Sequence, residues 1–138
     1  MNVGWLLDSS ALGLAHQKEV ASRLLPMLSA GLLYTCPLLD LEALATAATA
    51  QAYRKMRADR RQAYSSVPFE TAVGERALRL QARVGRLAGS GVRPRDLLVA
   101  ATALEHQLAV LHHHPAFTLL GEICELEQHP VSALGALE

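Results

Sequence analysis

The chain has 138 residues, and its formal net charge is zero because 13 Lys and Arg residues balance 13 Asp and Glu residues. This balance excludes a bulk electrostatic attraction to nucleic acid or membranes, so any such attraction has to come from local clusters of charge. Hydrophobic residues make up 51% of the chain but aromatic residues only 4%. We therefore expect one domain over residues 1–138, with a core of Leu, Ala and Val.

The cysteines and the apolar runs predict a cytoplasmic protein without a membrane partner. Cys36 and Cys124 lie far apart among apolar neighbours, which is typical of buried free thiols in a reducing compartment. No basic residues precede the first apolar run and Asp8 interrupts it, so we expect no signal peptide. Asp40 and Glu42 interrupt the longest candidate for a membrane span.

The first half of the chain predicts two short buried strands, each followed by helices. Residues 3–7 form an apolar run that ends at Asp8, and residues 32–36 form a second run that ends before Pro37. Pro26 is expected to kink or divide the first long helix. The helices expected here cover residues 17–30, 38–49 and 51–64, with a short one beginning near Ala11.

The second half predicts an amphipathic helix, a buried helix and a third buried strand. An apolar stripe at spacings of four and three predicts a helix over residues 70–88, after a brief extended break at 67–69. The helix from Leu97 to about Gln107 is apolar on nearly every face, and the strand at 108–111 lacks polar alternation, so both have to be buried. The remaining expectations are a helix at 117–124, an edge strand at 127–131 and a frayed tail at 132–138.

This alternation of strands and helices predicts the fold class. Strands that are separated by helices favour a parallel sheet with helices on both faces. We expect an α/β fold in which three layers, α/β/α, enclose a small central parallel sheet. The connections between its strands should be right-handed crossovers.

Acidic residues lie next to these predicted elements in three places. Asp8 follows the first strand, and ligands bind at the carboxyl ends of strands in open parallel sheets. The residues alone leave equally open that Asp8 only caps the next helix. Asp40 and Glu42 lie in the first turns of one helix, where its dipole favours acids, and we select Glu42 as the one near the sheet. Asp96 begins a strongly apolar helix, where an acid is costly unless something pairs with it.

Three segments together resemble the PIN-domain family, and within it the VapC-type ribonuclease toxins of bacterial toxin–antitoxin pairs. The segments are LLDSSAL, CPLLDLEAL and RPRDLLVAATALEHQLAVLHHHPAF, and the third is the most specific. The resemblance covers most of the chain and implies the PIN-like version of the α/β/α fold. Position by position, it implies that Asp8, Glu42 and Asp96 are catalytic acids that hold Mg²⁺ or Mn²⁺, whereas Asp40 falls at a variable position.

The resemblance implies a metal-dependent endoribonuclease that acts on RNA and is neutralised by a cognate antitoxin protein. It also implies a homodimer, and no DNA specificity of this chain's own. The physical chemistry agrees, because phosphodiester hydrolysis uses a hard cation to neutralise phosphate oxygens and to acidify water. Carboxylate oxygens are the ligands that such cations prefer.

The sequence departs from the family's pattern after the third strand. His114 and Ala116 occupy positions that are usually acidic, so the second metal position has lost its usual ligand. Three interpretations of residues 112–114 are open: an inert strand end, a substitute metal ligand at His114, or RNA contact or proton transfer. A neutral imidazole suits Mn²⁺ better than Mg²⁺, which leaves a nuclease dependent on Mn²⁺ as one rival. The other rival is a catalytically impaired module that still binds an antitoxin-like partner.

Basic residues gather on two of the predicted helices. Such stripes are typically solvated helix faces, but beside a nuclease site they also position an RNA backbone by neutralising phosphates. The helix at 51–64 carries Arg54, Arg57 and Arg61, to which we assign RNA binding as a hypothesis. The next helix carries Arg76, Arg79, Arg83 and Arg86, and an acidic partner covers such a stripe equally well.

Overall fold

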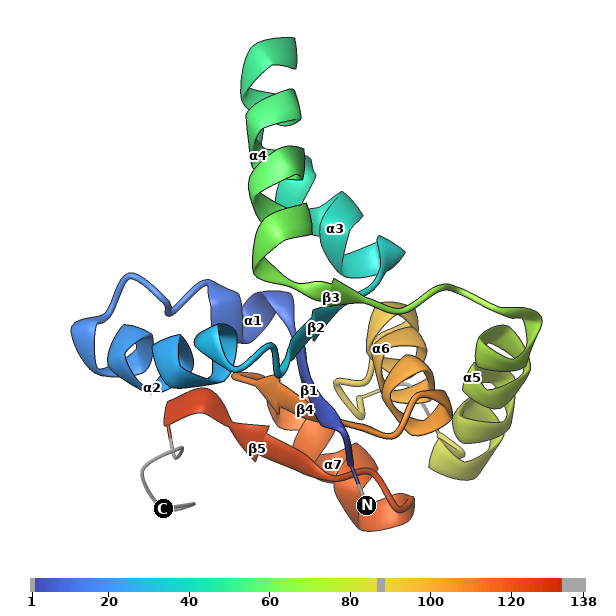
Figure 1. The fold of residues 1–138 in the computed structure, drawn as a ribbon. Helices are drawn as coiled ribbons and strands as arrows, with labels where there is room; N and C mark the ends of the chain where they lie inside the picture. Colours follow the sequence, from blue (N-terminus) through green and yellow to red (C-terminus); the bar gives the residue numbers. More distant parts are fainter. Residues whose placement is uncertain (1, 87–88, 133–138) are drawn as a thin grey trace.

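A five-stranded parallel sheet forms the centre of the protein in this computed structural model, which describes residues 2–86 and 89–132 (Figure 1). The strands are β1 Gly4–Leu7, β2 Leu33–Thr35, β3 Ser65–Ser66, β4 Leu108–His112 and β5 Gln128–Pro130. Their order across the sheet is β3-β2-β1-β4-β5. The chain therefore builds one half of the sheet outward from β1 and then returns to the other side of β1 for β4 and β5.

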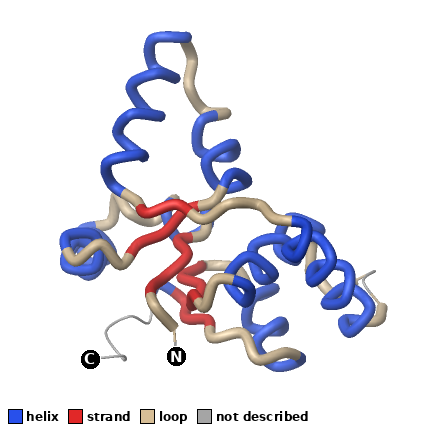
Figure 2. The backbone as a smooth tube through the Cα atoms, turned by 45° about the vertical axis from the view of Figure 1, so that its right-hand side comes forward, coloured by secondary structure: helices blue, strands red, loops and turns tan. Residues whose placement is uncertain are grey.

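Helices cover both faces of this sheet, which confirms the three-layer α/β/α fold (Figures 1 and 2). The helices are α1 Ser9–Leu12, α2 Lys18–Ser29, α3 Pro37–Leu44, α4 Ala50–Ala63, α5 Thr71–Val84, α6 Pro94–Glu105 and α7 Pro115–Ile123. Helices α1 and α2 lie on one face, and α5, α6 and α7 lie on the other. Helices α3 and α4 form a hairpin that projects beyond the sheet (Figure 1).

Alternate residues of the central strands supply two apolar clusters, one on each face. Leu6 of β1 pairs with Val110 of β4, and both belong to the larger cluster with α5, α6 and α7. Leu7 and Leu111 are the next pair, and they belong to the smaller cluster with α1 and α2. Burial of both faces explains why these strands lack polar alternation in the sequence.

Helix α6 is buried as its composition predicted. Val99, Ala100, Ala101 and Ala103 have no exposed surface, because the helix lies between the sheet and α5. Burial of this kind on several faces is compatible only with an apolar helix. The helix begins at Pro94, so Asp96 lies inside its first turn and not before it.

Several predicted boundaries were wrong for local reasons. Helix α2 is continuous through Pro26, so of the two predicted outcomes, a kink or a division, the division is wrong. The carbonyl that loses its partner belongs to Ser22, an exposed residue. The helix expected at 38–49 ends at Leu44, and Thr49 starts α4 by accepting a hydrogen bond from the amide of Ala52. Helix α5 ends before Gly85, whose φ of 74° breaks the helix.

Other expectations were met in part or fall outside the described residues. The edge strand predicted at 127–131 is present as β5, whereas β3 was not predicted. The expected helix end at Ala88 and the tail at 133–138 lie outside the described residues. Of the helices in the described ranges, none combines the length and the hydropathy needed to cross a bilayer.

Candidate active site

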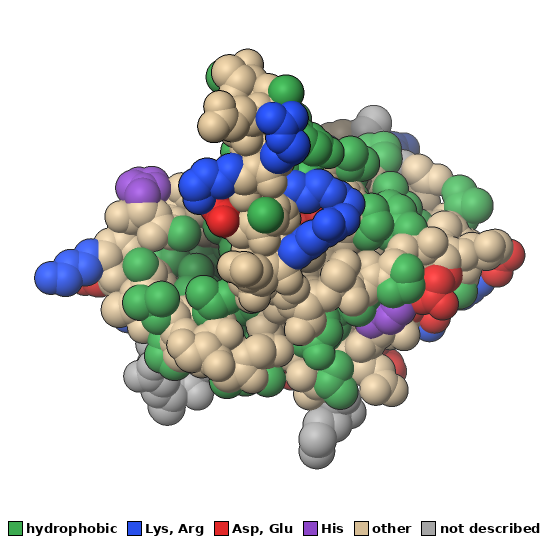
Figure 3. All heavy atoms as spheres, turned by 45° about the horizontal axis from the view of Figure 1, so that its top comes forward, with side chains coloured by type: hydrophobic (Ala, Val, Ile, Leu, Met, Phe, Trp, Pro, Cys, Tyr) green, Lys and Arg blue, Asp and Glu red, His purple; other side chains and the backbone are tan. Residues whose placement is uncertain are grey.

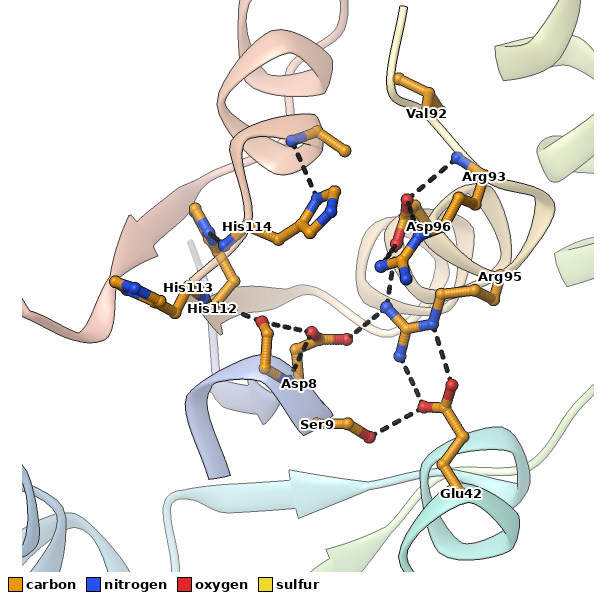
Figure 4. A network of polar contacts seen from close by, with 12 residues as sticks. Asp8, Ser9, Glu42, Val92, Arg93, Arg95, Asp96, His112, His113 and His114 are labelled. Atoms are coloured by element: carbon orange, nitrogen blue, oxygen red, sulfur yellow. Dashed lines mark hydrogen bonds and ion pairs between the residues drawn. The ribbon is translucent and has the colours of Figure 1, made fainter. Parts of the chain in front are cut away.

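Three acidic side chains meet at the carboxyl edge of the sheet, around one arginine (Figure 4). Asp8 follows directly after β1, and Glu42 lies on α3, which begins after β2. Helix α6 precedes β4 and runs back along the sheet, so its first turn, with Asp96, reaches the same edge (Figure 1). The sheet thus brings together residues that are far apart in the sequence.

Asp8 is the N-cap of α1, and one of its oxygens is held by that helix. Its Oδ2 accepts hydrogen bonds from the amide of Ser10 at 3.0 Å and from the Ser10 hydroxyl at 2.6 Å. The amide of His113 donates to the same hydroxyl at 2.8 Å, which ties this corner to the end of β4. The other oxygen, Oδ1, is buried and accepts no aligned hydrogen bond from the described residues. The structure therefore shows the capping role and leaves Oδ1 turned towards the other acids.

Asp96 has no exposed surface and lies at the third position of α6. Its Oδ2 accepts from the amide of Arg93 at 2.9 Å and from Arg93 Nε at 3.0 Å. Its Oδ1 accepts from Arg93 Nη2 at 2.9 Å and from Arg95 Nη1 at 2.9 Å. The positive end of the helix dipole adds to these donors. Two arginines of the same turn thus supply the counter-charge that the sequence analysis had left to a metal.

Glu42, and not Asp40, belongs to the acid cluster, which we define as Asp8, Glu42 and Asp96. Glu42 accepts hydrogen bonds from the Ser9 hydroxyl at 2.8 Å and from Arg95. Its side chain is 33% exposed, so this carboxylate is the one that reaches solvent. Asp40 instead pairs with Arg60 Nε at 2.8 Å. Asp40 also accepts from the hydroxyl of Thr35 in β2 at 3.1 Å, so the prediction that Glu42 is the acid of α3 near the sheet was wrong. Glu42 is instead the acid of α3 that joins Asp8 and Asp96 around Arg95.

Arg95 lies at the centre of the acid cluster and contacts all three of its members (Figure 4). Its Nη1 is 2.8 Å from Asp8 Oδ1 and 2.9 Å from Asp96 Oδ1. Its Nη2 and Nε donate to the two oxygens of Glu42 at 2.6 and 3.1 Å. Only 15% of the Arg95 side chain is exposed. The guanidinium therefore occupies the space between the carboxylates.

The charges in this site hold each other ionised. Burial raises the pKa of Asp96, but hydrogen bonds from Arg93 and Arg95 outweigh it and set the pKa below its ordinary value. Burial also raises the pKa of Glu42, and hydrogen bonds from Arg95 and Ser9 bring it below its ordinary value. Burial lowers the pKa of Arg95, but the bond to Glu42 and the charge of Asp8 raise it overall. The guanidinium is therefore firmly protonated.

The donor set fits a hard divalent cation in its chemistry. All three side chains offer carboxylate oxygens, and Asp8 Oδ1 is a buried acceptor without an aligned donor. In the arrangement described here the carboxylates close on Arg95. Within residues 2–86 and 89–132, no group of three or more His, Cys, Asp and Glu side chains is close enough to hold a metal ion as it stands. A metal therefore requires a rearrangement at this point.

The histidines at the end of β4 have structural contacts of their own. His112 is buried, and its Nε2 lies 2.6 Å from Gln128 Oε1 while its Nδ1 accepts from the amide of His114 at 3.2 Å. His114 is the N-cap of α7, with Nδ1 accepting from the amide of Ala116 at 3.2 Å. These contacts give both rings a structural role. A metal-binding role for His114 stays a prediction.

The two basic stripes differ in their surroundings. Lys and Arg side chains gather around α4 (Figure 3), where Arg54, Arg57 and Arg61 are exposed. A hollow of about 300 Å³ near the base of α4 is lined by Arg57, Arg60 and Arg61 among others. On α5, Arg76 donates to Glu105 of α6 at 2.6 Å, so an acidic partner covers part of that stripe.

A groove of about 440 Å³ connects the acid cluster to α4. Ser9 and Glu42 line one part of it, and Met56 and Arg60 of α4 line another. The groove thus gives access from solvent to the exposed carboxylate of the cluster. A ligand that lies in it contacts both the acid cluster and α4.

Four residues that contact the three acids or orient them were not predicted from the sequence. Arg93 and Arg95 flank Asp96 in the segment RPRD, and this adjacency was the available signal. Ser9 and Ser10 follow Asp8 in LLDSSAL, where they were considered only as helix caps. In the structure these side chains orient the three acids instead.

Comparison with known proteins identifies relatives over most of the chain. The family model for the PIN domain matches residues 5–118. Ribonuclease VapC21 of Mycobacterium tuberculosis is 33% identical over 124 residues, which cover 89% of this chain and 90% of the relative.

Solved structures share the fold. DNA-bound VapBC from Salmonella typhimurium has a TM-score of 0.71 at 15% identity, covering 94% of this chain and 98% of that one. VapBC2 from Rickettsia felis, bound to a promoter DNA fragment, has a TM-score of 0.70 at 12% identity, with coverage of 91% and 97%. At such low identities, the likeness bears on the fold alone.

Proposed function

We propose that this chain, which belongs to the PIN-domain family, is a metal-dependent endoribonuclease toxin of VapC type that hydrolyses RNA phosphodiester bonds. The observation that carries the proposal is the convergence of Asp8, Glu42 and Asp96 on one point. The relative named Ribonuclease VapC21 supports the substrate class. Mg²⁺ or Mn²⁺ is the proposed cofactor, because the donors are carboxylate oxygens.

The three acids have different tasks in this proposal. A divalent cation, when bound, neutralises phosphate oxygens and acidifies a water molecule. Asp8 and Asp96 are buried and held by Ser10 and Arg93, so they provide fixed oxygens. Glu42 is partly exposed at the groove, so it is the acid nearest to an entering substrate.

The basic face of α4 is the proposed RNA contact. Arg54, Arg57 and Arg61 are exposed there, and the groove leads from this helix to Glu42. Such contacts neutralise phosphates and position the backbone without reading its sequence. Arg60 is excluded from this role because it is already paired with Asp40.

A cognate antitoxin is the proposed protein partner. Solved neighbours are described as VapBC and as a toxin–antitoxin complex, which supports a partner of this class. The groove beside Glu42 is the surface where such a partner would block access. A homodimer belongs to the proposal on family likeness alone.

One observation favours an alternative function, an impaired module that binds an antitoxin-like partner without cutting RNA. His114 and Ala116 replace usually acidic residues, and His114 Nδ1 already accepts from the amide of Ala116. If acids at these two positions are essential for catalysis, the protein would keep its fold and its groove but would not cut RNA.

An RNA-cleavage assay separates these functions. We expect the purified protein to cut RNA with Mg²⁺ or Mn²⁺ and to stop when EDTA is added. Asp96→Asn should lower the rate about 100-fold or more, because a cation ligand contributes several kcal/mol to the transition state. Cleavage with Mn²⁺ alone that vanishes in His114→Ala would identify the Mn²⁺-dependent rival. Protein that binds a partner but cuts with neither metal would contradict the proposal and support the module.

The impaired module has its own test. Replacing both residues together, His114→Asp with Ala116→Asp, should revive cleavage if their loss is the defect. A double variant that stays inactive while it remains folded would show that these two positions are not the cause.

A further inference from the structure

We propose that the guanidinium of Arg95 is the resident cation of the acid cluster, and that a divalent metal ion binds there only by displacing it. This inference rests on the proposed function in one respect, namely that the acid cluster is a metal site. It goes beyond that function because metal binding becomes an exchange, in which the metal ion replaces the guanidinium of Arg95 between the acids.

The positions of the contacts make the two cations mutually exclusive. Nη1 of Arg95 lies between the two buried aspartates, 2.8 Å from Asp8 Oδ1 and 2.9 Å from Asp96 Oδ1. An ion that binds these same two oxygens has to lie between them as well. Carboxylate oxygens approach Mg²⁺ to about 2.0–2.1 Å, whereas Nη1 lies 2.8 and 2.9 Å from the same two oxygens, so an ion that binds both of them takes the place of Nη1. There is no room for both.

The charges make the two cations compete for the same acids. Two fully buried aspartates and the half-buried Glu42 face one another, and like charges at this range oppose ionisation. Arg95 compensates all three acids at once, so its removal takes from buried Asp8 the cation that it pairs with, while Asp96 keeps Arg93. A divalent ion restores that compensation. Its net affinity therefore equals what it gains from the acids minus what Arg95 loses.

Arg93 provides the contrast that defines this role. Its side chain is 50% exposed, and the acid that it pairs with is Asp96, through Nε and Nη2. It does not contact Asp8 or Glu42, so it does not occupy the space between the acids (Figure 4). Arg93 is therefore compatible with a bound metal, whereas Arg95 is not. The two residues have the same side chain on the same helical turn, which makes them a matched pair for an experiment.

The route by which Arg95 leaves is set by Glu42. The two aspartates are buried on the inner side of the guanidinium, and the partly exposed Glu42 lies on the outer side. Arg95 Nε and Nη2 hold both oxygens of Glu42. The guanidinium can thus give up the aspartates first by moving towards the groove, where solvent replaces the lost contacts.

Calorimetry with Mn²⁺ on the full chain, stripped of metal, tests the exchange. Arg95→Gln should bind Mn²⁺ at least about tenfold more tightly than the wild type, because the site no longer has to be vacated first. Arg93→Gln should change the affinity much less, about threefold at most, since Arg93 does not occupy the space between the acids and does not have to leave it. Equal gains in both variants would overturn the inference, because they would indicate a general charge effect. An Arg95→Gln affinity equal to that of the wild type would overturn it as well.

A second measurement does not depend on the stability of Arg95→Gln. In side-chain NMR of the wild type, titration with Mg²⁺ should shift the Arg95 Nε–H signal with the same midpoint as metal binding. The Arg93 signal should change less, and Arg95→Lys identifies which signal is which. An Arg95 signal that stays in place at saturating Mg²⁺ would overturn the inference.

The outcomes distinguish this inference from the proposed function. If the wild type cuts RNA with metal and Arg95→Gln binds Mn²⁺ no better, the function stands and the inference fails. If the wild type binds no Mn²⁺ while Arg95→Gln does, Arg95 is the resident cation and metal-dependent cleavage by this chain fails. If neither protein binds Mn²⁺, the acid cluster is no metal site, and both are overturned.

Discussion

At the scale of single residues, each acid of the cluster serves the fold and the site at once. Asp8 caps α1 with Oδ2 while Oδ1 faces Arg95, and Asp96 accepts from the amide of Arg93, the N-cap of α6, while it contacts the same guanidinium. The sequence posed helix capping and cation binding as alternatives for Asp8. A carboxylate has two oxygens, so Asp8 can cap the helix with one oxygen and face a cation with the other.

His112 gives a pH-dependent prediction at this scale. Burial lowers the pKa of His112 more than the bond to Gln128 and the charge of Asp8 raise it. The neutral ring fits its contacts, because Nε2–H donates to Gln128 while Nδ1 accepts from the His114 amide. The unfolded chain therefore binds this proton more readily than the folded chain does. The stability that neutral His112 contributes is fully present above about pH 7, and it is lost as the pH falls below about 6.5.

Urea unfolding between about pH 7 and pH 5.5, in EDTA, measures this contribution. The wild type should lose stability over this range, and His112→Gln should lose less. His113→Gln is the control, because His113 is exposed and its side chain should not matter. A decline that persists in His112→Gln and disappears in His113→Gln would refute the assignment.

At the scale of elements, the sequence predicted which helices and strands exist better than it predicted where they begin and end. The apolar run of α6 identified a buried helix, and the lack of alternation identified β1 and β4 as buried strands. Strand β3 has only two residues, Ser65 and Ser66, and both are exposed, so no apolar pattern marks it. Its pairing with β2 depends on how the α3–α4 hairpin returns the chain to the sheet edge, which no local signal encodes.

Helix α4 carries the prediction that belongs to this scale. Arg57 and Arg61 lie four apart on its exposed face, and if they contact phosphates, replacing both with Ala should weaken RNA binding at any sequence. The dependence of affinity on salt should also become less steep, by about two phosphate contacts. Filter binding with uncleaved RNA in EDTA, over a range of salt concentrations, measures both effects.

Helix α5 offers the matched control. Arg79 and Arg83 are also four apart and exposed, but they lie on a helix that does not line the groove. The pair Arg79→Ala with Arg83→Ala should leave the salt dependence nearly unchanged. If both double variants weaken RNA binding equally, the affinity depends on the total positive charge of the protein and not on a contact with the face of α4.

At the scale of the whole molecule, strand order explains why distant acids meet. Strand β1 lies in the middle of the sheet, with β2 on one side of it and β4 on the other. Ligand sites in open parallel sheets form at such a switch point, beyond the carboxyl ends of the strands. The sequence was sufficient to place Asp8 and Asp96 at this edge, because parallel strands and the helices between them fix which ends meet.

The position of Arg95 between these acids could not be predicted in the same way. Arg95 and Glu42 are distant in the sequence, and their pairing depends on the direction of two long side chains across two helices. Periodicity gives a residue's face but not its rotamer. For this reason the sequence placed the acids correctly but assigned their counter-charge to a metal alone.

The most direct test of the central claim is Mn²⁺ binding to the wild type and to Asp8→Asn, Asp96→Asn and Asp40→Asn, followed by the EPR signal of free Mn²⁺. Asn keeps the shape of the side chain and its capping bond, so the fold should survive. We predict that Asp8→Asn and Asp96→Asn each weaken binding by at least about tenfold. Asp40→Asn should bind like the wild type, because Asp40 pairs with Arg60 outside the acid cluster. Unchanged binding in Asp8→Asn and Asp96→Asn would contradict the claim that these acids form one metal site.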